Sequence, residues 1–122
     1  MKAKILLVDD SGMARRGVRQ ILEAEGYTVV EAEDGMSALE RYFIDKPDLV
    51  LLDLVMKGMK GLEVLQKLRE MDANVCAIVV SADIQESSRR MAIDAGAHGF
   101  LTKPVDRAGL LRTVAGVLEA RA

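Results

Sequence analysis

The chain has 122 residues, of which 50% are hydrophobic, 30% charged and 3% aromatic, and its formal net charge is -2. This length and composition predict one globular domain with its own core, and the single cysteine, Cys76, excludes an intramolecular disulfide. The lack of a basic excess and of aromatic side chains argues against direct nucleic-acid binding. No apolar run resembles a signal peptide or a membrane span, so we expect a cytoplasmic protein.

Five apolar runs with the composition of strands follow one another along the chain. They are KILLV from Lys4, YTVVE from Tyr27, DLVLLDL from Asp48, VCAIVVS from Val75 and HGFLT from His98. Turn-forming residues separate the runs, as in the DG, KPD and AGAHG segments. We therefore expect five strands.

Segments with helical spacing of apolar residues lie between these runs. Four of them predict a shared apolar face: Ala14, Val18, Ile21 and Leu22; Met36, Leu39 and Phe43; Val64, Leu65, Leu68 and Met71; and Leu110 or Leu111 with Val114, Val117 and Leu118. The segment 84–95 is polar as far as Met91, so it predicts the least well anchored helix. The basic cluster of Arg15, Arg16 and Arg19 is interpreted as a solvated helix face.

Strands that alternate with helices predict βαβ units, and therefore a parallel sheet with helices on both faces. The first, third and fourth runs are almost continuously apolar, as central strands are, whereas the second and fifth alternate more, as edge strands do. We predict a flavodoxin-like, doubly wound α/β fold with strand order 2-1-3-4-5. We expect it to form a single domain over residues 1–122, without an output domain.

Polar residues with chemical potential follow the predicted strands at one end. The first strand ends in Asp9 and Asp10, the third at Asp53 and the fourth at Ser81, and the fifth leads into Lys103. In such sheets function lies beyond the carboxyl ends of the strands, at the switch point between strands one and three. The topology therefore predicts that these side chains meet.

Taken singly, each of these residues also has a structural interpretation. Asp10 or Ser11 could cap the following helix, and Asp53 could cap the loop after it. Together the acids are harder to explain, because three neighbouring carboxylates repel one another. A hard divalent cation relieves the repulsion, and Mg2+ favours one or two carboxylates plus a phosphate. A carboxylate beside Mg2+ could then attack a phosphoryl group and form an aspartyl phosphate.

The chain resembles the receiver domain of two-component response regulators, especially the single-domain chemotaxis type. The matching segments are ILLVDDS, GYTVVEAEDGMSALE, PDLVLLDLVMKGMKGLEVL, VVSAD and AGAHGFLTKP, which occur in order and cover essentially the whole chain. The resemblance implies a signalling protein rather than an enzyme, apart from its own phosphorylation and dephosphorylation. A sensor histidine kinase or phosphotransfer protein would donate the phosphoryl group, and a downstream target protein would read the change. It implies no direct nucleic-acid or membrane partner, and a monomer or a phosphorylation-dependent dimer.

The same resemblance implies roles around the phosphoryl group. Asp53 is the expected phosphoacceptor, and Ser81 and Lys103 are expected to contact the phosphoryl oxygens. Ser81 and Phe100 are expected to form the switch that responds to phosphorylation. Ser81 stands where Thr is commoner and keeps the hydroxyl, whereas Phe100 stands where many members have Tyr and cannot donate a hydrogen bond.

The resemblance also implies how the metal and the attacking water are handled. Mg2+ is expected to bind Asp10, Asp53 and the backbone carbonyl of Val55 directly, and Asp9 mainly through water. Positions 55 and 83 flank the site and tune the loss of the phosphoryl group. Val55 cannot orient a water molecule, whereas Asp83 could. We therefore expect a long-lived phosphoryl state.

The sequence departs from the family at two further positions. Lys57 stands where the family usually has Pro, which predicts a less rigid loop, and Val105 replaces a frequent Phe.

Three alternative functions are compatible with parts of the sequence. The first is a Mg2+-dependent phosphohydrolase of the haloacid-dehalogenase type, but such enzymes usually carry a second Asp at the position of Val55. A flavodoxin-like cofactor binder needs a phosphate loop where this chain has Asp9 and Asp10. A pseudo-receiver would fold in the same way without being phosphorylated.

Overall fold

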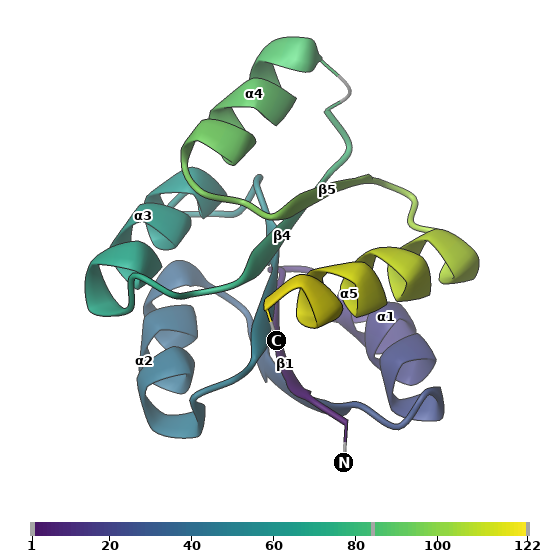
Figure 1. The fold of residues 1–122 in the computed structure, drawn as a ribbon. Helices are drawn as coiled ribbons and strands as arrows, with labels where there is room; N and C mark the ends of the chain where they lie inside the picture. The colour runs from purple at the N-terminus through teal and green to yellow at the C-terminus, as the bar shows by residue number, and fades with distance from the viewer. Residues whose placement is uncertain (1, 84, 122) are drawn as a thin grey trace.

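The computed structural model describes residues 2–83 and 85–121, and Figure 1 shows its sheet lying between two layers of helices. Strands and helices alternate along the chain, as the sequence predicts: β1 (Lys4–Val8), α1 (Gly12–Ala24), β2 (Thr28–Ala32), α2 (Gly35–Asp45), β3 (Leu49–Asp53), α3 (Gly61–Met71), β4 (Ala77–Ser81), α4 (Glu86–Asp94), β5 (Gly99–Thr102) and α5 (Arg107–Arg121). Ile84, at the start of the predicted polar segment, lies outside the described residues.

The five strands are parallel and are ordered β2-β1-β3-β4-β5, which confirms the predicted topology. In the centre of the sheet, Leu7 of β1 pairs with Leu51 of β3, and Leu52 of β3 pairs with Val79 of β4. All residues of β3 are buried, as expected for the middle strand of a sheet covered on both faces. The last residue of this buried strand is Asp53, so its carboxylate lies at the edge of the core.

Side chains of successive strand residues point to opposite faces, and each face has its own core. One cluster contains Leu6, Val50 and Val79 and is covered by α2, α3 and α4. The other contains Leu51 and Ile78 and is covered by α1 and α5, which Figure 1 shows on the other side of the sheet. The predicted doubly wound fold is therefore confirmed.

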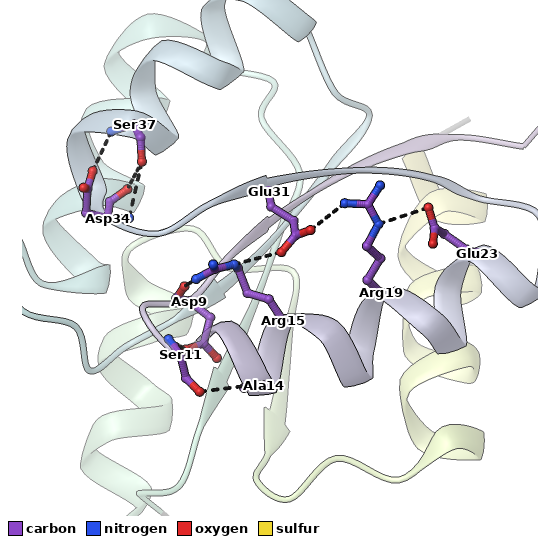
Figure 2. A network of polar contacts seen from close by, with 9 residues as sticks. All are labelled: Asp9, Ser11, Ala14, Arg15, Arg19, Glu23, Glu31, Asp34 and Ser37. Carbon is purple, nitrogen blue, oxygen red and sulfur yellow. Dashed lines mark hydrogen bonds and ion pairs between the residues drawn. The ribbon is translucent and has the colours of Figure 1, made fainter.

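The predicted apolar face of α2 is wrong at Met36 and Phe43, although Leu39 does pack against the core. Met36 and Phe43 are 68% and 64% exposed, and the helix buries Gly35, Ala38 and Tyr42 instead. The capping box between Asp34 and Ser37 fixes where the helix starts (Figure 2). Gly35 then lies so close to α3 that an added Cβ would come within 2.9 Å of the Val64 side chain. This close approach selects the face that carries Gly35.

The other predicted helix faces are mostly confirmed. Val64, Leu65 and Leu68 of α3 are buried, but Met71 at its end is 48% exposed because the helix stops there. In α4 the single buried residue among those described is Ala92, in agreement with its polar sequence. No helix within residues 2–83 and 85–121 is long and apolar enough to cross a membrane.

Candidate functional site

Three carboxylates meet beyond the carboxyl ends of β1 and β3. One carboxylate oxygen each from Asp9, Asp10 and Asp53 lies within 4.8 Å of the other two. Asp9 and Asp53 are only 6% and 7% exposed, whereas Asp10 faces solvent. The prediction that the topology brings these three acids together is confirmed.

Lys103, which follows β5, joins two of these acids. Its ammonium donates hydrogen bonds of 2.9 Å to Asp9 Oδ2 and 2.9 Å to Asp53 Oδ2. Partial burial disfavours the charged form of Lys103, but the hydrogen bonds to Asp53 and Asp9 outweigh it and hold the pKa of the ammonium above its usual value. The lysine therefore stays charged at neutral pH and offsets part of the negative charge of the cluster.

Backbone N–H groups bind the remaining carboxylate oxygens. Ser11 N–H donates to Asp9 Oδ1 at 2.9 Å, Val55 N–H to Asp53 Oδ1 at 3.0 Å, and Lys57 N–H to Asp10 Oδ2 at 3.1 Å. Proline has no N–H, so the last bond depends on a non-proline residue at position 57. Lys57 thereby ties the loop after β3 to the loop after β1.

The donor atoms of this cluster suit a hard divalent cation. Three carboxylates carry more negative charge than Lys103 neutralises, and their oxygens are close enough to share one ion. All the candidate ligands are oxygens, the type that Mg2+ prefers. Asp9, Asp10 and Asp53 therefore fit the metal that the sequence predicts.

Ser81 and Phe100 lie on the opposite face of the sheet from this cluster. Ser81 points to the same face of β4 as Ala77 and Val79, because every second residue of a strand shares a face. It is fully buried, and its hydroxyl accepts a hydrogen bond of 3.0 Å from Asp83 N–H. Within the described residues no hydrogen bond joins Ser81 to Asp53. Phe100 of β5 is half-buried and packs against the hydrophobic core that contains Val79, on the side of the sheet covered by α2, α3 and α4. Ser81 thus reaches the predicted edge of the sheet, where its hydroxyl binds the Asp83 N–H.

Both carboxylate oxygens of Asp83 accept hydrogen bonds from groups at the start of α4, although the sequence suggested that this residue could orient a water molecule. Its Oδ1 accepts from the Gln85 N–H at 2.9 Å, and its Oδ2 accepts from the Ser88 hydroxyl. Hydrogen bonds from Ser88 and then Gln85 lower the pKa of this carboxyl below its usual value. Asp83 therefore stabilises the first turn of α4.

A chain of ion pairs supports the loop that carries Asp9 (Figure 2). Arg15 of α1 donates to the backbone carbonyl of Asp9 and, at 2.8 Å, to Glu31 of β2. Glu31 also pairs with Arg19, which reaches Glu23 at 3.1 Å. Burial alone would raise the pKa of Glu31, but hydrogen bonds from Arg19 and Arg15 lower it, so Glu31 is ionised at neutral pH.

The interpretation of the basic cluster as a solvated face is therefore wrong for Arg15, whereas 38% of the Arg19 side chain is exposed and fits it. Only 16% of the Arg15 side chain is exposed, and it bridges α1, β2 and the β1–α1 loop. The signal in the sequence was Glu31, an acidic residue in the middle of a predicted strand. Arg16, between the two, is exposed and fits the original interpretation.

An apolar cavity of about 500 Å³ opens beside the acids. Met13, Ala14 and Gly17 of α1 line it, as does Val105, which precedes α5. Asp9, Asp53 and Lys103 also line the cavity, so it is continuous with the carboxylate cluster.

Comparison with known proteins gives one family over nearly the whole chain. Residues 5–115 match the model of the response regulator receiver domain. The chain is 38% identical over 120 residues to the chemotaxis protein CheY of Halobacterium salinarum, covering 98% of this chain and 100% of the relative.

Solved structures of receiver domains have the same fold as this chain. A CheY-like receiver domain protein from Methanospirillum hungatei superposes with a TM-score of 0.93 at 28% identity, covering 99% of this chain and 97% of that one. The CheY in a CheX–CheY–BeF3–Mg complex from Borrelia burgdorferi is 34% identical, with a TM-score of 0.89 and coverage of 93% and 87%. These similarities extend over the sheet and over all the strand ends that form the carboxylate cluster.

Proposed function

The chain belongs to the response regulator receiver domain family of two-component signalling, and we propose that it is a switch phosphorylated on Asp53. The observation that carries the proposal is the position of Asp53. Its carboxylate ends the most buried strand, lies beside two further acids, and is held by Lys103 at 2.9 Å. A sensor histidine kinase or phosphotransfer protein is the proposed donor, and the cytoplasm the proposed location.

The proposed chemistry assigns a task to each residue of the cluster. A carboxylate oxygen of Asp53 attacks the phosphorus, and the donor group leaves with its electron pair. Lys103 moves from its carboxylate partners to the incoming phosphoryl oxygens and neutralises part of their charge. Asp9, Asp10, Asp53 and the Val55 carbonyl would hold Mg2+, which when bound supplies further charge stabilisation at those oxygens.

The proposed output is a change in protein contacts. Ser81 would turn its hydroxyl toward the new phosphoryl group and give up the bond from Asp83 N–H. Phe100 packs on the same side of the sheet and would move into the space that Ser81 leaves. The face formed by α4, β5 and α5 would then present a different surface to a target protein acting in trans, as a monomer or as a phosphorylation-dependent dimer. The similarity to CheY favours a chemotaxis pathway.

The experiment that tests this function is intact-mass measurement after incubation with Mg2+ and acetyl phosphate. We expect a gain of one phosphoryl group per chain, found on the peptide that contains Asp53. Chelation of Mg2+ by EDTA should abolish the gain. No gain by a folded, Mg2+-binding protein from either acetyl phosphate or a histidine kinase would make the chain a pseudo-receiver.

Replacement of Arg15 by Gln is expected to weaken Mg2+ binding. Arg15 holds the backbone of Asp9 in place, and losing such indirect support of a metal ligand typically costs about tenfold in affinity. Calorimetric titration with Mg2+ at a temperature where both proteins are folded gives the dissociation constant. The exposed neighbour provides the control, since Arg16→Gln should leave the constant within about twofold. Equal effects of the two substitutions would mean that Arg15 does not position the site.

The phosphoryl group on Asp53 is expected to be long-lived because nothing at position 55 can direct water at it. Val55 is 71% exposed but carries no polar side-chain atom, and Asp83 is engaged at α4. Val55→Asn should speed the loss of the phosphoryl group about fivefold, the value of one hydrogen bond of about 1 kcal/mol to the attacking water. The decay is followed by intact mass after removal of the donor. Loss from the wild-type protein within seconds would contradict the expectation.

A further inference from the structure

The apolar cavity beside the acids lies on the same face of the sheet as Asp53. Leu51 and Asp53 are two residues apart on β3, so their side chains point the same way, and both line the cavity. Its volume of about 500 Å³ is within the range of about 300–1,000 Å³ that is typical of small-molecule sites. One end of the cavity is charged, with Asp9, Asp53 and Lys103, and the rest is apolar.

Small side chains explain why this space is hollow. Ala14 and Gly17 lie one helical turn apart on α1 and line the cavity, as does Val105, which precedes α5. A Cβ added at Gly17 would meet nothing within 4 Å, so a larger side chain would extend into free space there. These short side chains leave the space between α1 and α5 unfilled.

We propose that this cavity takes the hydrocarbon chain of an acyl phosphate, so that acyl phosphates longer than acetyl phosphate are the preferred small-molecule donors. The inference rests on the proposed phosphorylation of Asp53 and adds to it a preference for longer acyl chains among small-molecule donors. Charge and shape support the assignment together. The phosphate group would bind Lys103 and a cation, and the hydrocarbon chain would pack against the apolar wall of the cavity. An apolar molecule without a phosphate group would bind only the apolar part of the cavity, and inorganic phosphate would bind only its charged end.

The transfer balances with no further reactant. An oxygen of the Asp53 carboxylate forms a bond to phosphorus, and the bond between phosphorus and the acyl oxygen breaks. The fatty carboxylate leaves with the electron pair and is already stable as an anion, so no proton donor is needed. The hydrocarbon chain remains against α1 until the carboxylate dissociates.

The test compares butyryl phosphate with acetyl phosphate at equal Mg2+, using initial rates of phosphorylation from intact mass. Butyryl phosphate carries two more CH2 groups, and burial of each is worth about fourfold in equilibrium terms, so the rate at low donor concentration should rise about 15-fold. Phosphoramidate, which has no acyl chain, serves as the reference donor. Equal rates with the two acyl donors would overturn the inference.

Gly17→Leu fills the cavity from α1 and should bring the rates with the two acyl donors within about twofold of each other. The matched control is Gly116→Leu in α5, where an added Cβ also meets nothing within 4 Å but which lies outside the cavity. That variant should keep the preference of about 15-fold for butyryl phosphate. A preference that persists in Gly17→Leu would overturn the inference. Failure of all three donors to label the folded wild-type protein would instead count against the proposed function, so the two failures are distinguishable.

Discussion

Asp53→Asn is expected to abolish phosphorylation while leaving the fold at least as stable as that of the wild type. The amide has no nucleophilic oxygen that can form an acyl phosphate, so no phosphoryl group should be gained with Mg2+ and acetyl phosphate. The side chain keeps its volume, its single oxygen can still accept from Val55 N–H, and Lys103 keeps its hydrogen bond to Asp9. Intact mass and thermal unfolding measure the two effects.

The stability of this variant follows from the charges of the cluster. In the absence of Mg2+, three acids with oxygens within 4.8 Å of one another face one lysine. Removing one charge relieves repulsion worth up to about 1 kcal/mol, and Lys103 keeps its pair with Asp9. The variant should therefore unfold at an equal or higher temperature without Mg2+ and bind Mg2+ more weakly. Phosphoryl uptake by this variant at the wild-type rate would show that another residue is the acceptor.

Gly61→Ala is expected to cause the largest loss of stability. Gly61 begins α3 and is buried against the backbone that follows β3. An added Cβ would lie 2.7 Å from the Cα of Leu54 and would clash with the carbonyl oxygen of Asp53. Backbone atoms cannot rotate away as a side chain can, so we expect a cost of about 3 kcal/mol, the upper part of the range for overpacking. Urea denaturation gives the free energy of unfolding.

Two comparisons make this prediction specific. Gly116→Ala, in a helix with open space around the glycine, should instead stabilise the protein by about 0.5–1 kcal/mol because alanine favours helices. In Gly61→Ala the carbonyl of Asp53 has to shift, so Mg2+ binding should weaken even where the protein is fully folded. A loss of stability below about 1 kcal/mol would mean that the start of α3 moves without strain.

The fold and most of the site could be predicted because they depend on order along the chain. Apolar runs that alternate with helical segments define a parallel sheet, and the ends of its central strands have to meet. The meeting of Asp9, Asp10 and Asp53 follows from this alone, as does the arrival of Lys103 at the same edge.

The features that could not be predicted depend on distances between elements. Two overlapping apolar stripes fit α2, and the close packing of Gly35 against Val64 decides between them. The pairing of Arg15 with Glu31 requires knowing how near α1 lies to β2. The cavity behind Gly17 depends on the gap between α1 and α5, which a residue pattern does not specify.

The bonds of Lys103 also set the order in which the site can be built during synthesis. The lysine reaches Asp9 across 94 positions of sequence and Asp53 across 50. A ribosome that adds about 5–20 residues per second makes the acids several seconds before it makes their lysine. A nascent chain therefore carries the proposed acceptor without the lysine that is proposed to neutralise the phosphoryl oxygens. We expect competence for the proposed phosphorylation to appear only after β5 has joined the sheet and Lys103 can reach the two acids.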